Sequence, residues 1–181
     1  MAGTAKNSVE RESLTWDQFG HAAREIATEI YESGWMPDLV VAIARGGLLP
    51  AGAISYALGV KAIGTMNIEF YTDIAETLEA PVLIPPLMDT SALCGHKVLV
   101  VDDIADSGKT LALVMQMVRE LGIANPDGGE PMRVSEARSA TIYHKSRSVI
   151  EPDYVWKHTD AWVNFPWSTL PPVGRPDMEA A

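Results

Sequence analysis

The chain has 181 residues, of which 47% are hydrophobic and 21% are charged, so it is long enough for one globular domain with a substantial core. Its formal net charge of -10 argues against a general nucleic-acid surface, because such a surface needs clustered Lys and Arg to replace phosphate counterions. The same charge is compatible with a small phosphorylated ligand, because one bound cation or a few local donors reverse the field inside a pocket.

Neither a membrane span nor an export signal is visible in the sequence. No stretch of about 18 apolar residues occurs, and the first residues are small and polar. The single cysteine, Cys94, excludes an intrachain disulfide and favours a reducing compartment. We therefore expect a cytoplasmic protein with no membrane partner and no nucleic-acid partner.

The first predicted element is a helix near the N-terminus. Residues 1–13 are expected to form a poorly ordered arm. Thr15 and Gln18 then fit a capping box, and apolar residues recur at helical spacing until Ser33 and Gly34 interrupt the pattern. The pattern indicates a helix with one face in the core.

A predicted buried strand over residues 39–43 is followed by Arg45, Gly46 and Gly47 and then by a predicted helix over residues 48–58. Paired glycines after a strand let the backbone approach a ligand closely, and an arginine beside them offers a forked donor to phosphate oxygens. A plain turn with a surface arginine explains the same residues. From this turn alone, both interpretations stay open.

Residues 61–70 are expected to form a third strand, after which the chain loses clear periodicity as far as residue 95. Three prolines, Pro81, Pro85 and Pro86, fall in this stretch. A segment of this length without regular structure is typical of a lid, a hairpin excursion or disorder. Its apolar content disfavours plain disorder, and we expect either a hairpin or a contact with a neighbouring subunit.

Residues 98–101 form an unbroken apolar run that indicates a strand buried on both faces of a parallel sheet. Asp102 and Asp103 follow at its end, and a helix is predicted over residues 111–121. The loop before that helix contains Asp106, Ser107, Gly108, Lys109 and Thr110. Ligands bind at the carboxyl ends of strands in open α/β sheets, and helix N-termini favour phosphate. The two carboxylates suit sugar hydroxyls or a hard cation such as Mg²⁺.

Two other phosphate-related motifs fit this stretch less well. A P-loop needs a glycine where Asp103 stands, although Gly108, Lys109 and Thr110 match its end, and a carboxylate there would repel a triphosphate. A two-component receiver domain would need more chain than remains after Val98, and it would leave the first half of the chain unexplained.

The C-terminal part adds two short predicted strands, over residues 140–143 and 154–156, and Lys145 follows the first of them. An aromatic cluster comes next. The alternation of strands, glycine turns and helices predicts an α/β fold with a mostly parallel central sheet flanked by helices. We expect one domain over residues 14–172 and a loose tail over residues 173–181.

The run VLVVDDIADSGKT, residues 98–110, resembles the signature with which type I phosphoribosyltransferases bind 5-phosphoribosyl 1-pyrophosphate (PRPP). The signature has four apolar residues, two acids, two variable residues, Asp, Ser or Thr, Gly, a variable residue and Thr, and every position is satisfied. The resemblance extends from about residue 14 to residue 172. It implies the type I phosphoribosyltransferase fold with a small C-terminal hood, Mg²⁺ as cofactor, and a homodimer or homotetramer.

The resemblance also implies roles for individual residues. Arg45 and Gly46 fall where these enzymes bind pyrophosphate, and residues 71–91 fall where they carry a flexible loop over the reacting centre. Asp102 and Asp103 would hold the ribose hydroxyls, directly or through Mg²⁺. The 5′-phosphate would lie on Asp106, Ser107, Gly108, Lys109 and Thr110, and Asp106 would be the catalytic acid/base group near the purine imidazole nitrogen.

Lys145 and the segment DAWVNFPW, residues 160–167, look like the purine-recognising part of bacterial xanthine-guanine phosphoribosyltransferases. In those enzymes a lysine reaches the exocyclic oxygen of a 6-oxopurine, an aromatic residue stacks on the base, and neighbouring backbone reads its edge. Carried over, these roles fall on Lys145, Trp162 and Val163. Each residue taken alone also has an explanation without a binding role: Lys145 as a surface lysine and Trp162 as an aromatic residue of the core.

The sequence thus predicts transfer of a 5-phosphoribosyl group from PRPP to guanine, xanthine or hypoxanthine. The alternatives are a phosphoribosyltransferase for another acceptor base and a non-catalytic regulator that senses PRPP. The segment 71–91 departs from part of the family, because it contains no Lys or Arg. The charge of pyrophosphate would therefore fall on Arg45, backbone donors and Mg²⁺.

Overall fold

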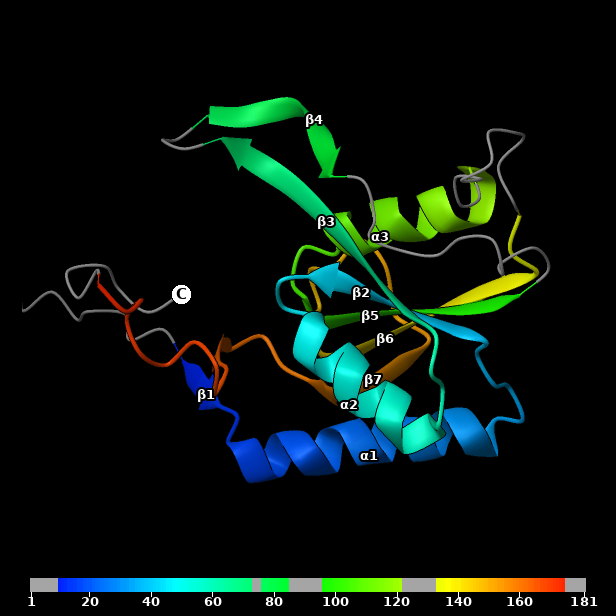
Figure 1. Cartoon of the computed structure of the whole chain (residues 1–181). Coiled ribbons are helices and arrows are strands. Elements are labelled where there is room, and N and C mark those ends of the chain that lie inside the picture. The colour runs from blue at the N-terminus through cyan, green and yellow to red at the C-terminus, as the bar shows by residue number, and fades with distance from the viewer. Residues whose placement is uncertain (1–9, 73–75, 85–95, 122–132, 175–181) are drawn as a thin grey trace, which may run out of the picture.

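The computed structural model describes residues 10–72, 76–84, 96–121 and 133–174. Its centre is a six-stranded sheet in the order β4-β3-β2-β5-β6-β7, in which only β4 runs antiparallel to its neighbour. The strands are β2 Leu39–Ala44, β3 Ile63–Thr72, β4 Glu76–Ile84, β5 Lys97–Ala105, β6 Glu136–His144 and β7 Tyr154–His158. Helices lie on both faces (Figure 1), so the predicted α/β class is confirmed.

Helices α1 (Trp16–Glu32) and α2 (Leu48–Leu58) cover one face of the sheet, and α3 (Lys109–Gln116) covers the other (Figure 1). The capping box at the start of α1 is confirmed in both directions, with Thr15 and Gln18 each accepting from the other's backbone N–H. The helix predicted over residues 111–121 begins two residues earlier, and its last turn is a π-helix, Met117–Leu121. None of the helices in the described ranges is long and apolar enough to cross a membrane.

Strand β5 is the centre of the core and is buried on both faces, as its apolar run predicts. Leu99 and Val101 pack towards α1 and α2, whereas Val98 and Val100 pack towards α3, and all four side chains are fully buried. Burial of such a side chain stabilises the fold by about 1.5–3 kcal/mol. The strand therefore provides a fixed base for the residues at its carboxyl end.

The chain between residues 71 and 95 is partly a hairpin. β4 pairs antiparallel with β3, with a register shift between Glu69 and Tyr71, and the pair extends beyond the rest of the sheet (Figure 1). The hairpin prediction is therefore confirmed for residues 76–84. Residues 85–95, with Pro85, Pro86 and Cys94, lie outside the described residues, as does the tail after residue 174.

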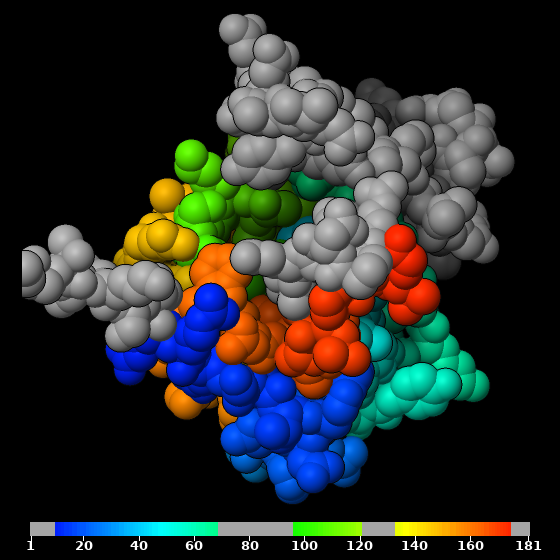
Figure 2. Space-filling view, turned by 90° about the vertical axis from the view of Figure 1, so that its left-hand side faces the viewer, coloured from blue at the N-terminus to red at the C-terminus, as the bar shows by residue number. Residues whose placement is uncertain are grey.

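The N-terminal segment differs from the prediction of a loose arm up to residue 13. Arg11–Ser13 form strand β1, which pairs parallel with β8 (Trp162–Asn164), so that Glu12 is opposite Val163. Figure 2 shows the blue N-terminal residues packed beside the orange and red C-terminal ones. A three-residue polar strand has no apolar alternation of its own, and its partner is about 150 positions away in the chain, so the local pattern could not reveal it.

Candidate active site

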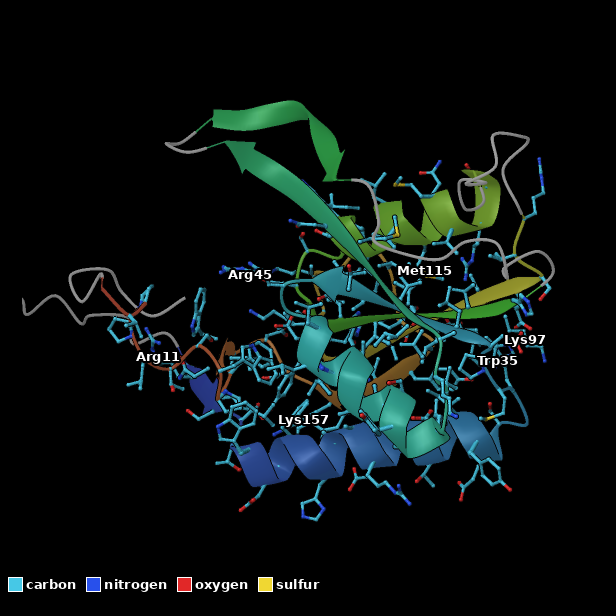
Figure 3. The ribbon with its side chains drawn as sticks, in the orientation of Figure 1. Arg11, Trp35, Arg45, Lys97, Met115 and Lys157 are labelled. Carbon is cyan, nitrogen blue, oxygen red and sulfur yellow. The ribbon has the colours of Figure 1, made fainter. Side chains whose placement is uncertain are left out.

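The carboxyl end of β5 lies against the loop between β2 and α2. A Cβ atom built at Gly46 would lie 2.5 Å from the carboxylate atoms of Asp103, and one at Gly47 would overlap the carbonyl oxygen of Val101. Both glycines are therefore needed for this close approach. Arg45 is exposed on the same loop and lies at the opposite end of the sheet from Lys97 (Figure 3), and the peptide bond that precedes it is cis.

Asp102 and Asp103 are partly buried, and they lie within β5 rather than after it, because the strand continues to Ala105. Burial, followed by the neighbouring charge of Asp103, raises the pKa of Asp102 well above its ordinary value. Burial also raises the pKa of Asp103 to about 6. Two carboxylates held this close together with little solvent favour a cation or hydroxyl donors between them.

The same pair fits magnesium bound together with a substrate. Hard carboxylate oxygens are the ligands that Mg²⁺ prefers, and it is usually bound by one or two of them plus water and substrate phosphate. In the described ranges no group of three or more His, Cys, Asp or Glu side chains could enclose a metal by itself. Thr141, paired in register with Asp102, adds a buried hydroxyl that has no hydrogen-bond partner among the described residues.

The predicted phosphate loop ends at Gly108, which caps α3 with a φ of 72°. This left-handed conformation favours glycine, and a Cβ atom there would overlap the hydroxyl of Ser148. The glycine supplies no capping side chain, and the Lys109 N–H donates to Ser107 Oγ at 3.5 Å, so the N–H groups of Thr110 and Leu111, which have no such partner among the described residues, are available to an anion. Ser107 and Lys109 are exposed at this point, and Thr110 is partly buried.

The loop after β6 lies directly on the phosphate loop. The Lys145 N–H donates to the carbonyl of Ala105 at 3.1 Å, and the Val149 N–H donates to the carbonyl of Ser107 at 3.0 Å. The Lys145 side chain is buried, with its Nζ 3.4 Å from Asp106 Oδ1 and 6.0 Å from the Trp162 ring centroid. The loop therefore brings the predicted base-binding lysine to the predicted acid/base group.

Arg147 belongs to this cluster, although nothing in the sequence singled it out. Its Nε donates to Asp106 Oδ1 at 2.7 Å, and its Nη2 forms an ion pair with the same oxygen. The hydrogen bonds to Asp106, followed by the charge of that carboxylate, raise the pKa of Arg147. The only available signal was its place two residues after Lys145, which does not predict a contact across 41 positions of the chain.

The C-terminal hood consists of β8 and the aromatic residues after it. Phe165 and Trp167 stack with ring centroids 4.9 Å apart, and Phe19 of α1 meets Trp167 edge-on at 5.3 Å. Trp162 remains 48% exposed, whereas Val163 is buried. The aromatic residues Phe165 and Trp167 therefore pack into the main core together with Phe19, whereas the Trp162 ring stays accessible.

Glu12 of β1 connects the hood to strands β6 and β7 of the sheet. Its Oε1 accepts hydrogen bonds from Lys157 Nζ at 2.6 Å and from the Tyr143 hydroxyl at 3.0 Å. Burial acts to raise the pKa of Glu12, but these hydrogen bonds outweigh it and hold the pKa below its ordinary value. Arg11 and Lys157 lie on the hood side of the molecule (Figure 3).

A cavity of about 680 Å³ joins the strand ends to the hood. Seven of the predicted site residues line it, namely Arg45, Gly46, Asp103, Asp106, Lys145, Trp162 and Val163. The other predicted residues, Asp102, Ser107, Gly108, Lys109 and Thr110, lie on the same strand and loop but not on the cavity wall. The rest of the wall consists of residues that were not individually predicted as site residues, namely Ile104, Phe165, Trp167, Ser168, Leu170 and Pro172.

Comparison with known proteins connects this site to one family. The model of the phosphoribosyl transferase domain matches residues 12–171. A xanthine-guanine phosphoribosyltransferase of Gluconobacter oxydans is 30% identical, over 98% of this chain and 99% of the relative.

Solved structures give the same result. A purine phosphoribosyltransferase from Pyrococcus horikoshii Ot3 superposes with a TM-score of 0.72 at 31% identity, covering 90% of this chain and 97% of that one. The fold is shared with a xanthine-guanine-hypoxanthine phosphoribosyltransferase of Helicobacter pylori, with a TM-score of 0.66 at 22% identity over 87% of this chain and 93% of the other. Both the sequence match and the fold thus confirm the predicted resemblance, and the chain belongs to the phosphoribosyltransferase family.

Proposed function

We propose that the protein transfers the 5-phosphoribosyl group of PRPP to the imidazole nitrogen of a 6-oxopurine, which gives a nucleoside 5′-monophosphate and pyrophosphate. The observation that carries the proposal is the cavity in which Asp103 and Asp106 meet Lys145 and Trp162. Similarity over nearly the whole chain to a xanthine-guanine phosphoribosyltransferase supports a purine acceptor. The proposed role is therefore purine salvage.

The ribose phosphate would be bound by the strand end and the start of α3. Ser107, Gly108, Lys109 and Thr110 present backbone N–H groups, hydroxyls and one ammonium group to the 5′-phosphate, where the helix dipole favours negative charge. Asp102 and Asp103 accept hydrogen bonds from the ribose hydroxyls. These two residues would also hold Mg²⁺, which supplies positive charge to the leaving pyrophosphate when it is bound.

Arg45 and Gly46 would bind the pyrophosphate from the other side of the cavity. The guanidinium offers a forked donor, and the glycine allows the loop to approach Asp103. As pyrophosphate leaves, positive charge develops on the ribosyl carbon, and the fixed carboxylates at the end of β5 stabilise it. The loop and the strand end therefore act on opposite ends of the breaking bond.

The purine would lie against the hood. Lys145 donates to the exocyclic oxygen, the accessible ring of Trp162 stacks on the purine, and the backbone at Val163 reads the opposite edge. Stacking on an aromatic side chain contributes about 1–3 kcal/mol for a nucleobase. Asp106 accepts the proton that the imidazole ring loses as its nitrogen bonds to the sugar.

We also propose that the protein works in the cytoplasm, as one domain over residues 14–172, and as a homodimer or homotetramer. A single cysteine is in keeping with a reducing compartment. The α2 side supports self-association, because Leu48, Leu49 and Tyr56 expose 42%, 41% and 93% of their surface there. Light scattering of the purified chain tests the oligomeric state.

Release of pyrophosphate from PRPP and Mg²⁺, measured with adenine, guanine, hypoxanthine, xanthine and orotate in turn, tests the activity. We expect release with at least one 6-oxopurine and none with adenine or orotate, and mass spectrometry should detect the matching nucleotide. Asp102→Asn/Asp103→Asn is the inactive control. Absence of release with every base, in a protein that still binds PRPP, would favour the PRPP-sensing alternative.

A further inference from the structure

Among the described residues, Arg147 is the one cation at the active site that has no role in the proposed function. Its side chain is 65% exposed, and the residue is not part of the cavity wall that Asp106 and Lys145 share. The proposed arrangement assigns no contact with PRPP or the purine to Arg147. Its contact in the described part of the chain is with Asp106, the proposed acid/base group.

The backbone around Arg147 is fixed on two sides. On the phosphate-loop side, the Val149 N–H donates to the Ser107 carbonyl at 3.0 Å. On the hood side, the backbone N–H and the hydroxyl of Ser146 donate to Asp160 Oδ1 at 2.9 and 2.8 Å. An arginine between two such anchors approaches Asp106 from a defined direction, which reduces the entropy lost in forming the ion pair.

Three cationic nitrogens converge on one oxygen of Asp106. Nε and Nη2 of Arg147 and Nζ of Lys145 all contact Oδ1. None of the described residues donates a hydrogen bond to Oδ2. The carboxylate is thus held by one oxygen, and the other is left to accept a proton or a hydrogen bond.

We infer that Arg147 is a positioning residue for Asp106, which it keeps in a reactive orientation when Lys145 binds the purine. The inference rests on the proposed function, in which the purine oxygen draws the Lys145 ammonium away from Asp106. Only Arg147 then remains on Oδ1. Without it, the carboxylate of a side chain that is 39% exposed rotates more freely.

The test is steady-state kinetics of Arg147→Met, which keeps an unbranched stem but removes the guanidinium, and of Arg147→Lys. Lys61→Met, on the exposed connection before β3, is the matched control for the loss of one positive charge. A positioned acid or base contributes about 10²- to 10⁴-fold to the rate, so we expect Arg147→Met to lower kcat about tenfold. The KM values for PRPP and the purine should change less than about threefold, and Arg147→Lys should recover part of kcat.

A double-mutant cycle with Asp106→Asn separates positioning from a general structural role. If Arg147 acts through Asp106, Arg147→Met should lower kcat in the wild-type background and have no further effect in the Asp106→Asn background. Equal losses in both backgrounds, or a raised purine KM with unchanged kcat, would overturn the inference. Failure of the proposed function is distinct, because the wild-type protein itself would then release no pyrophosphate.

Discussion

The two halves of the active site are supported in very different ways. The PRPP half stands on β5, a nine-residue strand in the middle of the sheet whose residues 98–101 are fully buried, and its loops depend on close glycine contacts. In the base half, Lys145 follows the central strand β6, but Trp162 and Val163 stand on β8, which is three residues long and paired with the three-residue β1. PRPP binding thus rests on the central strand, whereas stacking of the purine depends on a short two-stranded ladder, which is held by its backbone pairing, by the packing of Val163 and Phe165 into the core, and by side-chain contacts.

Asp106 belongs to both halves, so its replacement should have the largest effect. Asp106→Asn keeps the shape but removes the proton acceptor, and we expect kcat to fall about 10²- to 10⁴-fold. The affinity for PRPP, measured by calorimetry, should fall much less than kcat. Asp17→Asn, on the exposed first turn of α1, is the control. Wild-type turnover in Asp106→Asn would remove this residue from the acid/base role.

Lys145→Gln should weaken purine binding and leave PRPP binding unchanged. The buried ammonium is proposed to donate a charged hydrogen bond to the purine oxygen, and such bonds contribute about 1.5–3 kcal/mol. We therefore expect the KM for the purine to rise about 10- to 100-fold, with an unchanged Kd for PRPP. Lys61→Gln is the matched control. A variant in which both substrates bind equally poorly would show that Lys145 supports the loop and not the base.

Gly46→Ala should weaken PRPP binding and leave purine binding unchanged. The added Cβ would lie 2.5 Å from the Asp103 carboxylate, and overpacking of this kind costs about 1–3 kcal/mol. Calorimetry should show a Kd for PRPP that is about 5- to 100-fold higher, while the Kd for the purine, measured in the same way, should stay as in the wild type. Gly20→Ala, on α1 with nothing within 4 Å of the new Cβ, is the matched control and should leave both substrates unaffected.

The features that the sequence predicts are those that depend on local patterns of residues. The apolar run 98–101, the capping box at Thr15 and the helix after Gly47 are local patterns, and the structure contains all three. The family and the fold are confirmed with them. The roles of the individual site residues stay predictions, although the cavity brings seven of them together.

Features set by distant contacts could not be predicted. Strand β1 forms because Glu10 and Leu14 hydrogen-bond to residues 162 and 164, and no local pattern of its own marks it. The continuation of β5 to Ala105 was hidden because Asp102 and Asp103 end the apolar run. Arg147 meets Asp106 only after the loop beyond β6 has packed on the phosphate loop.

Glu12→Gln should have the smallest effect of these variants. It tests most directly how far side-chain contacts hold the base half of the active site. It weakens the Lys157 and Tyr143 contacts that hold the hood, and a partly exposed ion pair of this kind contributes about 0–1 kcal/mol. We therefore expect the KM for the purine to rise by up to about fivefold, with PRPP affinity unchanged. Lys157→Met should give a similar change, because it removes the same pair from the other side.

The stabilising contribution of the Glu12 contacts should decrease as the pH falls. Because the pKa of Glu12 is lowered in the folded protein, its contribution to stability is present above the ordinary value of 4.5 and is lost as the pH falls through the folded value. The wild-type purine KM should therefore approach that of Glu12→Gln as the medium becomes acidic, whereas the two proteins should differ most near neutral pH. Equal purine KM values for the two proteins at neutral pH would show that β1 and the aromatic packing alone hold the hood in place.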